Sequence, residues 1–145
     1  MDPIAVYEVA GKIILAKMPG GRGYMQPVLS VSRGASAEEV GRLARRVIQL
    51  SPDVASARSG DGESALMLEG AARTYAEFYR KARSCMILPG PDAMGRDADK
   101  IWVIPLRKRG RGASDLLHES ELTVGRQEPD VQLGDAILRA LAMSS

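Results

Sequence analysis

The sequence predicts an α/β protein of the α+β type, with a mostly antiparallel sheet of about five or six strands and two or three helices packed on it. Two observations lead to this prediction. Short runs rich in β-branched residues alternate with turns that contain glycine or proline, and two capping boxes each precede apolar residues at helical spacing. A chain of 145 residues has the size of one domain. We therefore expect a single domain over residues 1–145.

The first part of the chain predicts three strands. Apolar and β-branched residues lie on both sides of Ala10-Gly11-Lys12, which indicates two strands joined by a tight turn. A glycine-rich loop at residues 20–23 precedes a third strand over Pro27–Ser32. This loop is not a phosphate loop, because such a loop ends in Gly-Lys-Ser/Thr and opens a helix, whereas a strand follows here.

Capping boxes predict where two helices begin. Ser36 with Glu39 forms the first box, and Thr74 with Glu77 forms the second. The first helix has a buried apolar stripe made of Val40, Leu43, Ala44, Val47 and Ile48. Its opposite face carries Arg42, Arg45, Arg46 and Gln49. The second helix brings together Tyr75, Phe78, Tyr79 and Ala82, which we interpret as core residues rather than as a stacking platform.

A final helix is predicted from about Val131 to Met143, with Asp130 as its cap. Gly41 follows Val40 and Gly134 follows Leu133, each near the start of a predicted helix. Glycine in a helix costs about 1 kcal/mol relative to alanine, so its presence in both helices indicates close packing of helix backbone onto a sheet.

The remaining segments complete the predicted order of elements. Asp53–Glu63 is rich in small and polar residues and is expected to be a mobile connection, and Ala65–Leu68 fits either a strand or a helix. Two further strands are predicted over Ser84–Leu88 and Ile101–Leu106, separated by a long turn at residues 89–99. One more short strand is expected around Leu116 or Leu122.

Composition excludes several classes of protein. The 20 Lys and Arg residues nearly balance the 18 Asp and Glu residues, so the chain is not a polycation built for nucleic acid. No window approaches the roughly 20 consecutive apolar residues of a membrane span, and the N-terminal residues do not form a secretory signal, so we expect a cytoplasmic protein. Cys85 and His118 are the only residues of their types, which excludes an internal disulfide and a Cys/His metal site. No cofactor is predicted, and Cys85 is expected to be buried and inert.

The sequence contains no recognisable catalytic set. Ser114, Asp115 and His118 are the residue types of a triad, but no Gly-x-Ser-x-Gly turn surrounds the serine. Glu119 and Glu121 alternate like the exposed face of a strand, where neither would be desolvated into a general acid. We therefore predict that the protein is not an enzyme.

A basic run after the Ile101–Leu106 strand has two interpretations. Its cations are Arg107, Lys108, Arg109 and Arg111. They fit an exposed turn, where glycines permit positive φ and the cations keep the loop soluble. They also fit a small nucleic-acid-binding module, which could include the arginine face of the first helix. No aromatic residue stands beside the run for base stacking, so nucleic acid is the less favoured partner.

The chain resembles a family of bacterial immunity proteins from contact-dependent growth inhibition systems. The segments that carry the resemblance span nearly the whole chain: Val6–Val9, Arg22–Tyr24 leading to Pro27-Val28, Glu38–Gly41, Ile104–Leu106 with its basic tail, and Leu133–Leu141. The resemblance implies a small cytoplasmic α/β antidote that binds and blocks the toxic C-terminal domain of a cognate effector, commonly a nuclease. It implies no enzymatic activity and transfers no functional residues, because each immunity protein recognises its own toxin through variable surface positions.

The charge of the chain departs from what inhibitors of basic nucleases often show. Such inhibitors are frequently acidic, whereas this chain carries a net charge of +2. The partner would then be near neutral or acidic, or recognition would use a local acidic patch. The candidate acidic residues are Asp61, Glu63, Asp92, Asp97 and Asp99.

Overall fold

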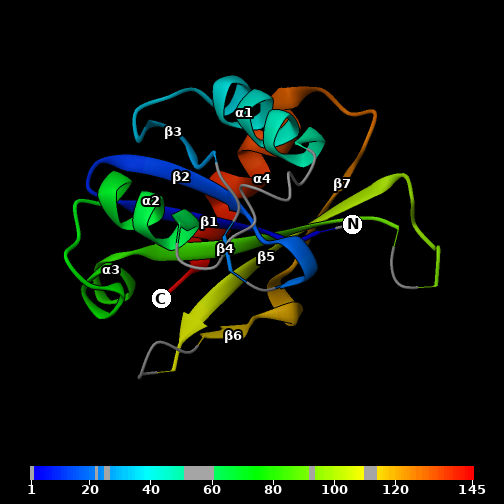
Figure 1. The fold of residues 1–145 in the computed structure, drawn as a ribbon. Helices are drawn as coiled ribbons and strands as arrows, with labels where there is room; N and C mark the ends of the chain where they lie inside the picture. Colours follow the sequence, from blue (N-terminus) through cyan, green and yellow to red (C-terminus); the bar gives the residue numbers. More distant parts are fainter. Residues whose placement is uncertain (1, 22, 25–26, 51–60, 92–93, 110–113) are drawn as a thin grey trace.

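The structure, a computed structural model, describes residues 2–21, 23–24, 27–50, 61–91, 94–109 and 114–145. These residues form an α+β fold in which four helices pack on a seven-stranded antiparallel sheet, which confirms the predicted fold class (Figure 1). The strands are β1 (Ile4–Val9), β2 (Lys12–Lys17), β3 (Leu29–Ser32), β4 (Arg83–Pro89), β5 (Lys100–Lys108), β6 (Ser114–Leu116) and β7 (Leu122–Gly125). The helices are α1 (Ala37–Gln49), α2 (Asp61–Glu69), α3 (Tyr75–Lys81) and α4 (Asp130–Met143).

The sheet runs in the order β3-β2-β1-β4-β5-β6, and β7 also pairs with β5. Strand β5 changes partner along its length, because residues 100–103 pair with β7 and residues 106–108 pair with β6. Pro105 lies at the change of partner. A proline lacks the N–H that a continuous ladder needs, so it is tolerated where one neighbouring strand ends and another begins. Both Leu116 and Leu122 are in strands, where the sequence predicted only one.

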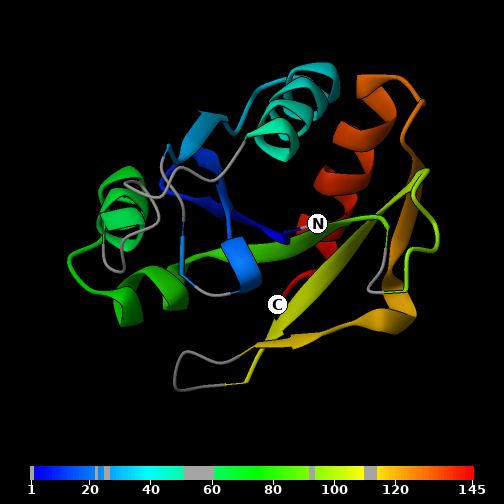
Figure 2. The ribbon, with the colours of Figure 1, turned by 45° about the vertical axis from the view of Figure 1, so that its right-hand side comes forward.

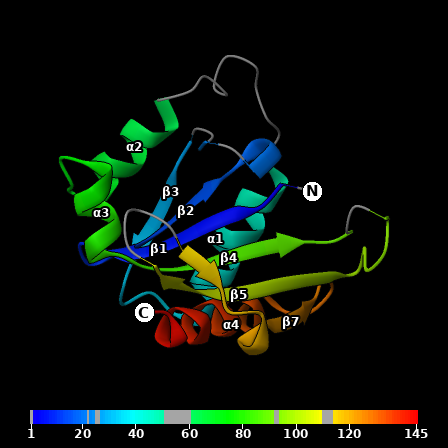
Figure 3. The same ribbon diagram turned by 90° about the horizontal axis from the view of Figure 1, so that it is seen from below.

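Each face of the sheet has its own hydrophobic core, because successive strand residues point to opposite sides. Ile4 and Val6 of β1 face α1 and α4, whereas Ala5 and Tyr7 face α2 and α3. Figures 2 and 3 show these two pairs of helices on different sides of the sheet. The first core includes the fully buried Cys85, and the second is centred on Phe78.

The capping boxes predicted the starts of α1 and α3 correctly. The Ser36 side chain accepts a hydrogen bond from the Glu39 amide, and the Thr74 side chain accepts one from the Glu77 amide. Phe78 is buried as predicted, whereas Tyr79 is half-buried and its hydroxyl lies within hydrogen-bonding distance of the Ser114 hydroxyl.

Gly41 and Gly134 lie at the crossing of α1 and α4. A Cβ atom built on Gly41 would lie 1.8 Å from the Asp130 carbonyl oxygen, and one on Gly134 would lie 1.7 Å from that of Ala37. The close approach inferred from the two glycines is therefore present, but the predicted partner was wrong. At these two glycines the backbones of α1 and α4 approach each other rather than the sheet, because both helices lie on the same face of it.

Two predictions at helix starts were also wrong. Asp61 and Glu63 belong to α2 and not to a connection, although residues 53–60 of the predicted mobile segment lie outside the described residues. Asp130 is not the cap of α4. It is the first helical residue, and its carboxylate forms an ion pair at 2.7 Å with Arg45.

Arg45 was predicted to point away from the protein, but it joins α1 to the segment before α4. Its guanidinium donates hydrogen bonds to the carbonyl oxygens of Arg126, at 2.7 Å, and Glu128. Arg42 and Arg46 are exposed, as expected. The arginine face of α1 is therefore smaller than the sequence suggested.

None of the described helices is both long and apolar enough to cross a bilayer.

Candidate partner-binding surfaces

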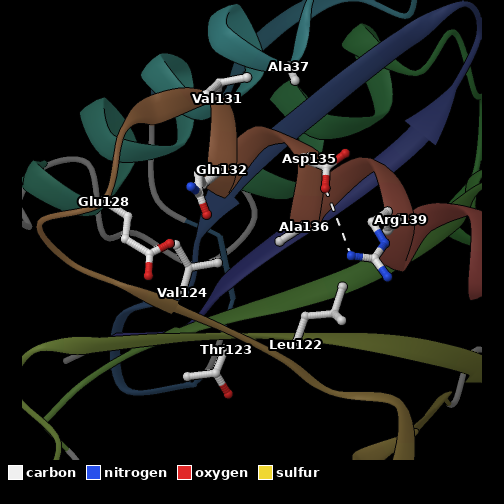
Figure 4. Close-up of a pocket in the computed structure, with 10 residues that line it drawn as sticks. All are labelled: Ala37, Leu122, Thr123, Val124, Glu128, Val131, Gln132, Asp135, Ala136 and Arg139. Carbon is white, nitrogen blue, oxygen red and sulfur yellow. Dashed lines mark ion pairs between the residues drawn. The ribbon is translucent and has the colours of Figure 1, made fainter.

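A groove lies between β7 and α4 (Figure 4). Leu122 and Val124 point from β7 toward the helix, whereas Thr123 points the other way, as alternation along a strand requires. The described lining residues are Ala37, Leu122, Thr123, Val124, Glu128, Val131, Gln132, Asp135, Ala136 and Arg139. The volume is about 380 Å³, near the lower limit for small-molecule sites.

The groove has an apolar floor and a polar rim. Val131 is 48% exposed, which is high for a large apolar side chain in this protein. On the rim, Asp135 and Arg139 form an i, i+4 ion pair at 3.9 Å, and both side chains are largely exposed. The described lining residues include no histidine, cysteine or serine. This chemistry suits the binding of a partner side chain better than catalysis.

The structure does not bring the predicted acidic residues into one patch. Glu63 is exposed on α2, while Asp97 and Asp99 are exposed in the turn between β4 and β5. Figures 1 and 3 place α2 and this turn on opposite sides of the molecule. Asp97 lies 3.5 Å from Lys100 as an ion pair. Asp92 lies outside the described residues, and of Asp61 only the backbone position is described.

Part of the basic run lies in strand β5, and two of its cations contact other groups of the protein. Arg107 and Lys108 belong to β5, so the predicted turn begins later than expected. Lys108 donates a hydrogen bond from its ammonium to the Arg80 carbonyl oxygen at 2.9 Å. Arg109 pairs with Asp115 at 3.3 Å. Arg107 is exposed, and Arg111 lies outside the described residues.

A second, polar cavity lies at the turn that joins β1 to β2. Its described lining residues are Glu8, Val9, Ala10, Gly11, Arg33, Lys81 and Arg83, and its volume is about 240 Å³. Ala10 and Gly11 have φ of 53° and 72°, so both turn residues are in the left-handed region that a tight hairpin of this kind uses. Neither this cavity nor the groove could be recognised in the sequence, because each is formed by residues far apart in the chain.

The residues that resemble a triad make other contacts. Asp115 pairs with Arg109, while His118 lies 3.6 Å from the carboxylate of Glu121. Residues 118–120 form a short 3₁₀ turn, so Glu119 and Glu121 do not alternate along a strand. Among the described residues, no three His, Cys, Asp or Glu side chains cluster as metal ligands. Cys85 is buried, and burial raises the pKa of its thiol well above the usual range.

Comparison with known proteins gives a likeness of fold. No protein-family model matches the chain, and no curated protein matches it either. A solved structure of a protein of unknown function from Neisseria meningitidis aligns with a TM-score of 0.72 and 12% identity, covering 100% of this chain and 96% of that one. A chain of the CdiA-CT/CdiI toxin and immunity complex from Yersinia pseudotuberculosis aligns with a TM-score of 0.70 and 14% identity, covering 99% and 97%. At these identities the comparison establishes the fold alone.

Proposed function

We propose that this protein is an immunity protein of a contact-dependent growth inhibition system, which acts in the cytoplasm by binding the C-terminal toxin domain of a cognate effector and blocking it. The observation that carries the proposal is the near-complete alignment, over 99% of this chain, with a chain of a toxin and immunity complex. The sequence resemblance to immunity proteins points to the same class independently of the fold. The proposal assigns the protein no enzymatic activity.

The surfaces of the protein support a binding role. The groove between β7 and α4 combines an apolar floor with charged rim residues, as the contact surfaces of protein complexes do. The polar cavity at the β1–β2 turn adds a charged site. Neither lining contains a histidine or a cysteine among the described residues.

A nucleic-acid-binding role is the alternative, and the contacts of the basic run weigh against it. Lys108 and Arg109 both contact groups of the protein itself, and their release would be needed before they could contact phosphates. A net charge of +2 also provides little long-range attraction for a polyanion.

The test is bacterial growth during expression of a candidate toxin domain encoded in a neighbouring gene, with and without this protein. The proposal predicts arrested growth with the toxin alone, rescue by co-expression, and co-purification of the two proteins. A toxic neighbour that this protein neither rescues nor binds would refute the proposal. Titration with single-stranded RNA and duplex DNA at low salt would then test the alternative, since phosphate contacts weaken steeply as salt rises.

A further inference from the structure

Cations gather at one end of the sheet. The β1–β2 turn, the end of α3, the start of β4 and the end of β5 all lie there, and Figure 3 shows α3 beside this end of β1. The polar cavity opens among the β1–β2 turn, the end of α3 and the start of β4, and three of its described lining side chains are cationic: Arg33, Lys81 and Arg83. Glu8 is its one described anionic lining residue.

Among the cations that line the cavity, the guanidinium of Arg83 is the one without an ion pair to a described residue. Glu8 and Arg83 are directly opposite each other in the β1–β4 register, which places their Cβ atoms within about 5.5 Å on the same face. The Glu8 carboxylate nevertheless pairs with Arg33, at 3.1 Å. Arg83 is exposed and forms no ion pair with any residue that the structure describes.

Lys81 is the second accessible cation of the cavity. Its ammonium pairs with Glu77 at 2.9 Å, and its side chain is 55% exposed. An exposed i, i+4 pair of this kind is weak, so the ammonium can turn toward an incoming anion at little cost. Arg83 and Lys81 together therefore form a cationic site whose single facing carboxylate is already used by Arg33.

We propose that this cavity binds a carboxylate-bearing, acidic segment of the toxin domain, with Arg83 as the main contact and Lys81 as the second. The inference rests on the proposed function and names the partner chemistry at one surface. A guanidinium suits this role because its planar donors match both oxygens of a carboxylate. The slightly basic charge of the chain, unusual for an inhibitor of a basic nuclease, agrees with a partner that presents acidic residues here.

The lining favours a protein segment over nucleic acid. No aromatic side chain is among the described lining residues, so the cavity lacks a platform on which a base would stack. A volume of about 240 Å³ accommodates one or two carboxylate side chains that enter from a neighbouring protein surface.

The test measures the affinity of purified variants for the toxin domain that the growth-rescue experiment identifies. The test variant is Lys81→Glu with Arg83→Glu. The control is Arg42→Glu with Arg46→Glu on the outer face of α1. It is matched in charge change, and Arg42 pairs with Glu38 at 2.9 Å as Lys81 does with Glu77. Thermal unfolding verifies that each variant folds, and Arg83→Gln and Arg83→Lys provide milder changes should the double reversal not fold.

The proposal predicts a Kd at least about tenfold higher for the test variant than for the control. Arg83→Gln should weaken binding more than Arg83→Lys, and the association rate of the wild type should fall more steeply with salt than that of the test variant. Wild-type binding with equal affinity of test and control variants would overturn this inference and leave the proposed function intact. No wild-type binding would overturn both. The wild type and the control could bind single-stranded RNA while the test variant does not, with toxin affinity unchanged in all three. That result would assign the cavity to phosphate binding instead.

Discussion

Gly41 of α1 and Gly134 of α4 meet backbone to backbone, so that a Cβ on Gly134 would lie 2.9 Å from the Gly41 amide nitrogen. The same Cβ would lie 1.7 Å from the Ala37 carbonyl oxygen, which no shift of a flexible side chain could relieve. The contact sets the distance between the two helices that cover one face of the sheet, and it places α4 beside β7, where the groove lies.

Gly41→Ala and Gly134→Ala should each destabilise the protein. Alanine favours a helix by about 1 kcal/mol over glycine, so a stabilised variant would be expected if the site had room. The backbone clash should instead lower the free energy of unfolding by about 3 kcal/mol. Urea unfolding measures this difference. Gly34→Ala is the control, because its Cβ would meet nothing closer than 3.8 Å, and equal losses at Gly34 and Gly41 would contradict the account.

Arg45→Met should destabilise the protein by about 1–3 kcal/mol. The substitution removes the partner of the Asp130 carboxylate and two hydrogen bonds to carbonyl oxygens of the connection between β7 and α4. Chemical denaturation measures the loss. Arg42→Met should cost only about 0.5 kcal/mol or less, because its pair with Glu38 is exposed. Similar losses for the two variants would show that Arg45 does not join the elements.

Glu69 should make stability depend on pH. Its carboxylate accepts hydrogen bonds from Lys12 and Ser30, and these lower its pKa, the Lys12 bond most strongly. The folded state therefore binds fewer protons than the unfolded state below the ordinary glutamate pKa of about 4.3. The stabilisation is complete above that value and is lost as pH falls through the lowered pKa. The difference in unfolding free energy between wild type and Glu69→Gln, at most about 1 kcal/mol, should shrink as pH falls below about 4.3. A difference unchanged at low pH would contradict this assignment.

Cys85 should not react with a thiol reagent while the protein is folded. Its side chain is fully buried in β4, and burial raises the pKa of the thiol, so little thiolate forms and none is accessible. Reaction with a chromogenic disulfide should follow the fraction unfolded as urea is raised. Rapid reaction without denaturant would show that β4 opens locally.

The sequence predicted those elements whose signals are local. Ser36 and Thr74 mark helix starts because a capping side chain bonds an amide three residues away, and this needs no knowledge of the rest of the fold. The β1–β2 hairpin was predicted for the same reason, from a turn between two β-branched runs. Helix α2 was left ambiguous because Ala65–Leu68 is a short apolar run, which fits a strand as well as a helix.

The sequence did not indicate which elements pack against each other in the folded protein. Gly41 and Gly134 signalled close packing, but whether a helix meets a sheet or another helix depends on the arrangement of all the elements. Asp130 has the residue type of a cap, yet Arg45, far away in sequence, binds its carboxylate. Both candidate surfaces also depend on how distant elements pack together. Arg33, Lys81 and Arg83 come together only after β3, α3 and β4 are placed.

The most direct test of the central claim is the activity of a purified candidate toxin domain, taken from a gene that neighbours this one, as this protein is added in increasing amounts. If the protein is the cognate immunity protein, toxin activity should fall in proportion to the protein added and vanish near equimolar concentration, without consumption of any cofactor. Full toxin activity in the presence of a large molar excess of this protein would contradict the account.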